Sequence, residues 1–193
     1  MGGPDVISQV RQLLPADWHA SLLAVDGTTT KDVPSQLQRM PSDASHLVLS
    51  VGGNDALMNS NILHMPAESA SQALGMLAEV SKQFEDRYRT VVNECRRLGL
   101  PLTLCTIYNG CFPDGVFQRT VATALMVFND VILRVAIECR LTIIDLRFVC
   151  SSPIDYANPI EPSSVGGAKI ARTIVNLVSA DHSKGSDTCV VIA

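Results

Sequence analysis

The chain has 193 residues, of which 47% are hydrophobic and 18% are charged, and it carries a formal net charge of −4. A chain of this length and composition can bury most of its surface around one core, which predicts a single globular domain. Lysine and arginine are scattered and the net charge is negative, so the positive surface that attracts nucleic acid is excluded.

No stretch of the sequence indicates a membrane span or an export signal. No apolar run reaches the roughly 18 to 20 residues that a bilayer requires, and the first residues lack a basic segment followed by an apolar one. We therefore expect a cytoplasmic protein without a membrane span. The oligomeric state is left open by the sequence.

Six cysteines are spread at irregular spacings, without a C-x-x-C pair and without a neighbouring histidine. This pattern favours buried free thiols over disulfides, and it does not indicate zinc binding. The six residues are Cys95, Cys105, Cys111, Cys139, Cys150 and Cys189.

Two kinds of apolar pattern alternate along the chain. The first element is an expected amphipathic helix, with Val6, Val10 and Leu14 on one face. Short apolar runs predict four strands, at residues 21–25, 46–51, 102–108 and 141–149. Apolar residues at spacings of three and four predict three longer helices, at residues 68–98, 116–139 and about 164–178. We expect one domain over residues 1–180 and a polar, flexible tail over residues 181–193.

Strands that are apolar on both faces belong to a parallel sheet with helices on each side, so the predicted fold class is α/β, a three-layer α/β/α sandwich. Ligands of such open sheets bind outside the carboxyl ends of the strands. Two of these ends carry residues suited to an oxyanion: Gly27 follows the first predicted strand, and Asn54 follows the second. A glycine lets backbone N–H groups approach a ligand, and an asparagine amide is a strong neutral donor.

Three segments make the chain resemble the SGNH, or GDSL-type, hydrolases over residues 3–180. The stretch LSVGGNDAL resembles the family block whose G-x-N-D turn supplies an oxyanion-hole asparagine, and LLAVDGTTTKDVPSQL is similar to the block before it. The stretch DYANPIEPSSVGGAKIARTI stands where the last block leads into the final helix. The resemblance assigns Gly27 and Asn54 to the oxyanion hole, where each donor is worth roughly 3 to 4 kcal/mol.

This resemblance also implies a fold and an activity. The fold is a flavodoxin-like sandwich with a five-stranded parallel sheet in the order 2-1-3-4-5. The activity is hydrolysis of acyl or O-acetyl esters of small molecules, lipids or carbohydrates by a Ser-His-Asp triad. No cofactor and no metal are implied.

The nucleophile of the family pattern is missing from this sequence. The family serine lies in a G-D-S motif after the first strand, and no Gly-Asp-Ser occurs in this chain. The opening residues MGGPDVISQVRQLL resemble the helix that follows that motif, so the first strand is missing as well. Ser8 lies inside the helical pattern, where no strand-to-helix turn exposes its hydroxyl.

The base of the triad is also altered. At the family positions D-x-x-H the sequence has Asp155 and Asn158, and an asparagine cannot accept a proton near neutral pH. By the resemblance, Asp155 and Asn158 are assigned to the part of the site where the family has its general base and the aspartate that orients it. A carboxylate whose pKa is raised by burial could act as the base, and Asp155 and Glu161 are the two candidates. His64, in the loop after the G-G-N-D turn, is expected to be a surface residue.

Loss of a central strand has a structural consequence and leaves the function open. Strands 21–25 and 46–51 either pair directly or keep unpaired backbone groups in the interior. Two functional interpretations stand side by side. The chain is an SGNH-type ester hydrolase, or a truncated form of one, or it is a non-catalytic pseudo-hydrolase that serves as a binding or scaffold protein.

Overall fold

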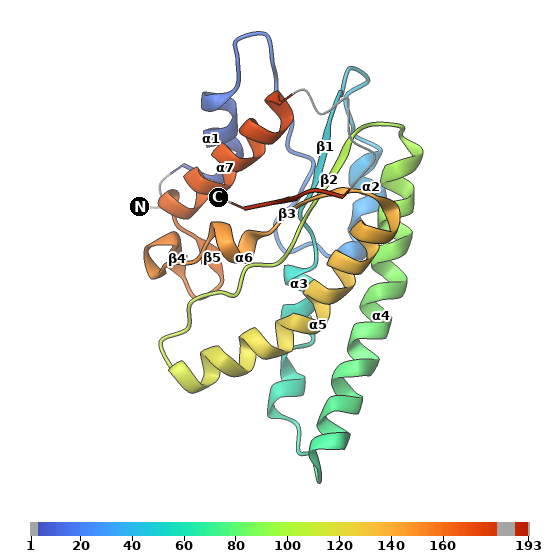
Figure 1. Cartoon of the computed structure of the whole chain (residues 1–193), viewed down its shortest axis with the longest axis vertical. Helices are drawn as coiled ribbons and strands as arrows, with labels where there is room; N and C mark the ends of the chain where they lie inside the picture. The colour runs from blue at the N-terminus through green and yellow to red at the C-terminus, as the bar shows by residue number, and fades with distance from the viewer. Residues whose placement is uncertain (1–3, 181–187, 193) are drawn as a thin grey trace.

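A parallel four-stranded sheet forms the centre of the molecule (Figure 1). The computed structural model describes residues 4–180 and 188–192. The strand order is β1-β2-β3-β6, with β1 at one edge and β6 at the other. The strands are β1 (Leu47–Leu49), β2 (Leu102–Cys105), β3 (Thr142–Ile144) and β6 (Val190–Val191).

Helices cover both faces of this sheet, so the three-layer α/β/α fold class is confirmed (Figure 1). One face carries α1 (Val6–Leu13) and α7 (Ser164–Ser179), which pack against each other. The other face carries the two long helices α4 (Ala70–Arg97) and α5 (Gly115–Cys139), together with the short α2 (Val33–Leu37).

Short elements lie at the loop ends of the sheet. They are α3 (Gly53–Met58), α6 (Leu146–Val149), the two-stranded antiparallel ribbon of β4 (Tyr156–Asn158) and β5 (Glu161–Pro162), and the 3-10 turns η1 (Thr30–Asp32), η2 (Ser60–His64) and η3 (Pro153–Asp155).

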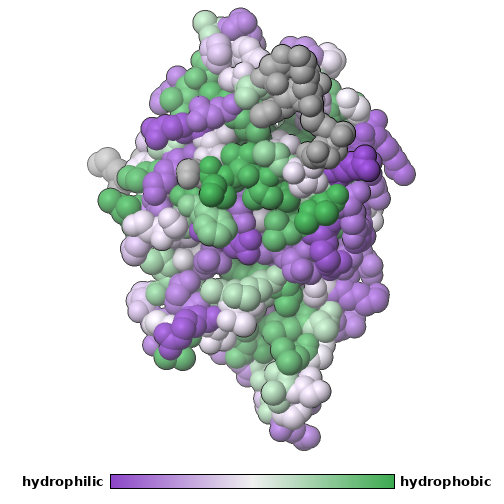
Figure 2. Space-filling model, in the orientation of Figure 1, coloured by the Kyte–Doolittle hydropathy of each residue, from purple (hydrophilic) through white to green (hydrophobic). Residues whose placement is uncertain are grey.

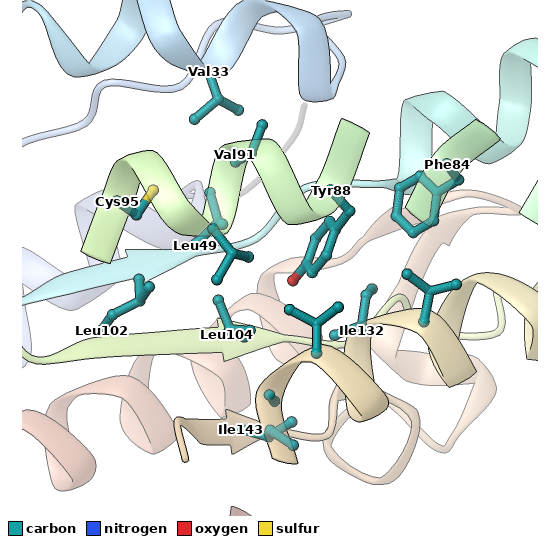
Figure 3. Close-up of a cluster of buried hydrophobic side chains, with 14 of the residues drawn as sticks. Val33, Leu49, Phe84, Tyr88, Val91, Cys95, Leu102, Leu104, Ile132 and Ile143 are labelled. Atoms are coloured by element: carbon teal, nitrogen blue, oxygen red, sulfur yellow. The ribbon is translucent and has the colours of Figure 1, made fainter. Parts of the chain in front are cut away.

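The strands bury side chains on both faces, as the apolar runs predict. Leu104 and Ile143 lie in the cluster beneath α4 and α5, and Figure 3 shows them in this cluster together with Tyr88 and Ile132. The next residues along the same strands, Cys105 and Ile144, turn to the α7 side. Burying one such side chain contributes about 1.5–3 kcal/mol, so the two clusters hold the three layers together.

The three predicted long helices are confirmed to within two residues at each end. Ser69 caps α4 by accepting the N–H of Gln72, and Gly99, with φ 71°, follows its end. Asp114 caps α5 through the N–H of Phe117. By length and composition alone α5 is apolar enough to cross a membrane, and it packs here against α4 and the sheet.

Residues 21–25 form no strand, contrary to the sequence prediction. Leu22 is 54% exposed and Val25 is 50% exposed, and the segment runs extended without a ladder partner. Arginine side chains bind the backbone here and at the residue before the segment: Arg39 Nη2 donates to the Leu23 carbonyl (2.6 Å), and Arg11 Nε donates to the Ala20 carbonyl (2.9 Å). A strand needs a neighbouring backbone, and no described segment supplies one here.

The end of the chain also differs from the prediction. Val190 and Val191 of the predicted tail form β6 and pair in parallel with Ile143 and Ile144. Figure 2 shows an apolar band across the middle of the face on which β6 lies in Figure 1. Residues 181–187 of that tail lie outside the described residues.

The cysteine prediction holds for part of the set. All six thiols are free, and Cys95, Cys105 and Cys150 are buried. Cys111 and Cys139 are half-buried, and Cys189 is exposed. Burial raises the pKa of the Cys105 thiol to about 12, so this group stays protonated at neutral pH.

Candidate active site

The G-G-N-D turn connects the carboxyl end of β1 to α3. Gly52 has φ 122°, a conformation that side chains rarely adopt. A Cβ at this position would also lie 3.0 Å from the Phe84 ring. The chain therefore needs glycine here to turn sharply from the buried strand into the helix.

The two polar residues of this turn bind the loop that follows the extended segment 21–25. Asn54 Nδ2 donates to the Thr28 carbonyl (2.8 Å). The buried carboxylate of Asp55 accepts the N–H of Thr30 (3.0 Å) and its hydroxyl (2.6 Å). The G-G-N-D turn thus holds two loops together through Thr28 and Thr30.

Gly27 and Asn54 line one common cavity. Gly27 is exposed with φ 75°, and no atom lies within 4 Å of where its Cβ would be. The cavity has a volume of about 1030 Å³, and it is lined mostly by apolar side chains. One amide hydrogen of Asn54 binds Thr28, and the side chain has a second. The structure brings these two residues together; their role as oxyanion donors remains a prediction.

Asp155 lies outside this cavity and braces the start of α7. It is fully buried, and Lys169 Nζ lies 2.8 Å from its carboxylate. Burial raises the pKa of this carboxyl, but the hydrogen bonds from Lys169 and from the backbone of Ser152 outweigh burial, so the pKa is lowered. A lowered pKa makes a weaker base, which is opposite to the shift that the sequence analysis considered. Gly166 packs so closely that a side chain there would collide with the Asp155 backbone.

Asn158 and Glu161 form a tight pair across the β4–β5 turn. The backbone N–H of Ile160 donates to Asn158 Oδ1 (3.0 Å), which fixes the orientation of the amide. Asn158 Nδ2 consequently points at Glu161 Oε2 and donates to it at 2.6 Å. Tyr108 supports the turn, since its hydroxyl donates to the Ile160 carbonyl (3.0 Å).

Glu161 is the member of this pair that lines the cavity with Gly27 and Asn54. Asn158 is not among the lining residues, and it reaches the cavity through Glu161. Glu161 is one of the two carboxylates that the sequence offered as a base, with Asp155. The three-residue spacing from Asn158, with Pro159 between them, is the local signal for the turn that joins the two side chains.

Ser8 and His64 are placed outside the cavity, which other serines and histidines line. Ser8 lies in α1, where its backbone N–H donates to Asp5 Oδ1 (2.9 Å), and it does not line the cavity. His64 stacks on Phe117, with ring centroids 6.2 Å apart. Within the described residues a serine–histidine hydrogen bond joins Ser45 to its neighbour His46 (3.1 Å), before the amino end of β1.

A search of curated proteins by sequence finds no match. Solved structures share the fold at 16% identity. An acetyl xylan esterase variant from Geobacillus stearothermophilus has a TM-score of 0.62, over 92% of this chain and 82% of its own. An extracellular lipase from Streptomyces rimosus has a TM-score of 0.58, over 80% of this chain and 77% of its own. A phospholipase A1 from Streptomyces albidoflavus has a TM-score of 0.54, over 80% of this chain and 77% of its own.

The sequence itself matches a family model. Residues 2–165 match the GDSL-like lipase/acylhydrolase family, and this match covers the G-G-N-D turn, the Gly27 loop and the Asn158–Glu161 pair. The chain therefore belongs to the GDSL-like lipase/acylhydrolase family, the SGNH hydrolases.

Proposed function

We propose that this chain hydrolyses an acyl or O-acetyl ester in the cavity that Gly27, Asn54 and Glu161 line. The observation that carries the proposal is the shared cavity. It joins two candidate donors for an oxyanion to a carboxylate that is oriented by a hydrogen bond. The family acts on esters, and the relatives named above include esterases and lipases.

Each of these residues has a role in the proposed reaction. Glu161 takes a proton from a water molecule, and the resulting hydroxide attacks the ester carbonyl carbon. The carbonyl oxygen becomes negatively charged and is held by the Gly27 N–H and the Asn54 amide. The C–O bond to the alcohol then breaks, and Glu161 returns the proton to the leaving oxygen. One water and one ester give one acid and one alcohol.

Water is proposed as the nucleophile because of the contacts that Glu161 makes. Among the described residues its hydrogen-bond partner is Asn158, and no serine hydroxyl is bonded to it. Asn158 acts as a positioning residue, since it touches Glu161 and does not line the cavity. The apolar lining suits an apolar acyl group more than a charged one.

The test is hydrolysis of p-nitrophenyl acetate and butyrate by the purified chain, next to Glu161→Gln prepared identically. We expect slow turnover that falls at least about 100-fold in Glu161→Gln, in the range that removal of a general base produces. Ser8→Ala should turn over at the parent rate. Equal rates for the parent and Glu161→Gln would refute the role of Glu161.

A second function is favoured by one observation: among the described residues the serine–histidine hydrogen bond, between Ser45 and His46, lies before the amino end of β1, whereas the G-G-N-D turn follows its carboxyl end. A non-catalytic pseudo-hydrolase would bind an ester without cleaving it. A fluorophosphonate probe separates the cases. Turnover without a covalent adduct supports the water mechanism, and turnover with an adduct supports a serine nucleophile. Binding of the ester without turnover and without a covalent adduct supports the non-catalytic pseudo-hydrolase.

A further inference from the structure

The two long helices run in the same direction and diverge toward their amino ends (Figure 1). Glu85 of α4 pairs with Arg134 of α5 at 2.8 Å, and one turn earlier Ser81 Oγ donates to the Val127 carbonyl (3.5 Å). Before this point the inner faces of both helices line the cavity of the candidate site. The lining residues there are Leu77 and Val80 of α4 and Val121, Ala124 and Leu125 of α5.

The G-G-N-D turn lies at the end of this space where the helices come together. The Phe84 and Phe128 rings join α4 to α5, with centroids 4.9 Å apart. A Cβ at Gly52 would lie 3.0 Å from the Phe84 ring, so the turn begins against this aromatic pair. Asn54 follows two residues later, which places the proposed carbonyl site next to the same end of the space.

The 3-10 turn η2 closes the opposite end. His64 of η2 stacks on Phe117, near the start of α5, with ring centroids 6.2 Å apart. Ile62 and Val80 line both this cavity and a separate groove between η2 and α4, so they form the wall between the two. We call the enclosed space the helix pocket, and its lining residues are Leu57, Ile62, Leu77, Val80, Val121 and Leu125.

The helix pocket differs in charge from the rest of the cavity. Among the described residues of α3, η2, α4 and α5 that line the cavity, none is charged. The carboxylates that line it, which include Glu161, belong to other segments. Six apolar side chains around an uncharged space favour a hydrocarbon group, and each methylene that such a space takes from water strengthens binding about fourfold.

The geometry of α5 sets the length of that hydrocarbon group. Phe128, Leu125, Val121 and Phe117 follow one another at spacings of three and four, so they share one face of the helix. At 1.5 Å per residue, Phe128 lies about 10 Å from Val121 and about 16 Å from Phe117 along the axis. An extended chain with C–C bonds of about 1.5 Å covers these lengths with about eight and about thirteen carbons.

We propose that the helix pocket binds the acyl chain of the substrate, so that the preferred substrate is an ester of a fatty acid of about eight to twelve carbons and not an acetate. This inference rests on the proposed hydrolysis and names its substrate class. Leu57 lies one turn after Asn54 on α3, so the same helix face leads from the carbonyl site into the pocket. The alcohol leaves on the side of Glu161, which lies on the β4–β5 ribbon.

The first experiment measures kcat/KM for p-nitrophenyl acetate, butyrate, octanoate and dodecanoate. For the parent chain, kcat/KM should rise with each added methylene, by up to about fourfold, until the pocket is full. Leu125→Trp, close to the Phe128 end, should lower kcat/KM for octanoate at least about 30-fold and leave acetate within about twofold. Val121→Trp, one turn farther on, should affect dodecanoate more than octanoate.

Met126→Trp is the matched control for these variants. Met126 neighbours Leu125 on α5, but its side chain is 60% exposed and does not line the cavity. This variant should keep the chain-length preference of the parent. A parent chain that prefers acetate, or a preference that Leu125→Trp and Val121→Trp leave unchanged, would overturn the proposal.

The second experiment measures binding without catalysis, by calorimetry with 2-decanone and 2-pentanone. A ketone has a carbonyl group and an alkyl chain but no leaving alcohol, so it is not hydrolysed. 2-Decanone should bind the parent chain at least about 100-fold more tightly than 2-pentanone. In NMR spectra of the parent chain, it should shift the methyl signals of Val121 and Leu125. Equal affinity for the two ketones, or shifts that spare both residues, would refute the assignment.

Together the two experiments tell which proposal fails. Binding of 2-decanone in the helix pocket without turnover of any ester contradicts the hydrolysis and retains the pocket. Turnover that is independent of chain length, without binding of 2-decanone, contradicts the pocket and retains the hydrolysis. A thermal melt establishes that each tryptophan variant is folded, and the NMR measurement needs no variant.

Discussion

The side-chain amide of Asn54 donates a hydrogen bond to the backbone carbonyl of Thr28 at 2.8 Å, which joins the turn after β1 to the loop after residues 21–25. Asp55, the next residue, binds Thr30 in the same way with its carboxylate. The G-G-N-D turn consequently has a structural role of its own, since it positions the loop that carries Gly27. Activity lost on mutating Asn54 would combine this structural role with the proposed role as an oxyanion donor.

Asn54→Ala should lower both stability and activity. The lost hydrogen bond to Thr28 should reduce the free energy of unfolding by about 1 kcal/mol. The lost oxyanion donor should lower kcat by about 100-fold or more, with little change in KM. Asn59→Ala is the matched control, because Asn59 Nδ2 donates to the Asp55 carbonyl at the same distance of 2.8 Å. Urea unfolding and ester kinetics on both variants make the comparison, and equal losses of kcat would contradict an oxyanion role.

Asn158→Ala should affect the reaction through Glu161. Without the 2.6 Å hydrogen bond the Glu161 carboxylate is free to rotate away from the cavity. We expect kcat to fall about tenfold with KM unchanged, because effects on a general base act on the chemical step. Asn158→Gln, whose amide sits one methylene farther out, should recover part of the loss. A rise in KM at constant kcat would instead place Asn158 in substrate binding.

Gly52→Ala should destabilise the fold strongly, whereas Gly53→Ala should not. A methyl group at residue 52 meets the Phe84 ring and the Ile107 side chain, and its backbone would remain at φ 122°. Strain and overpacking of this kind cost about 1–3 kcal/mol each. Gly53 lies at the first position of α3 with open space around it. Thermal unfolding of the two single variants tests this, and equal melting temperatures would contradict the packing argument.

Acid should weaken the contact between α4 and α5 through Glu85. Hydrogen bonds from Arg134 and Arg89 lower the pKa of Glu85 from 4.5 to about 2. The folded state thus binds the proton less tightly than the unfolded state, so the stabilisation is complete above pH 4.5 and is lost as the pH falls toward 2. Because the pairs are partly exposed, the stabilisation is on the order of 1 kcal/mol.

Glu85→Gln tests that contribution directly. The variant should be less stable than the parent chain at neutral pH, and the difference should shrink as the pH falls from 4.5 toward 2. Lys82→Gln serves as the control, since Lys82 and Asp86 form an exposed pair on α4 whose side chains are 71% and 67% exposed. Urea unfolding across this pH range gives the difference. A difference that stays constant with pH would refute the assignment.

Several features followed from the sequence because they depend on local patterns. The apolar spacing within residues 70–97 and 115–139 decides which face of each helix is buried, and capping side chains such as Ser69 and Asp114 fix where the helices begin. The continuous apolar runs around Leu104 and Ile143 indicated strands covered on both faces. The G-G-N-D turn placed Asn54 at a strand end for the same local reason.

Other features depended on which backbones lie next to each other, and the tertiary structure decided them. Residues 21–25 have the composition of a strand, but a strand requires a partner, and here arginine side chains bind the carbonyls of Leu23 and of the preceding Ala20 instead. Val190 and Val191 became a strand because the edge of β3 was open to them. Asp155 and Glu161 are both carboxylates in one segment, and only their surroundings separate a buried ion pair with Lys169 from a side chain that faces the cavity.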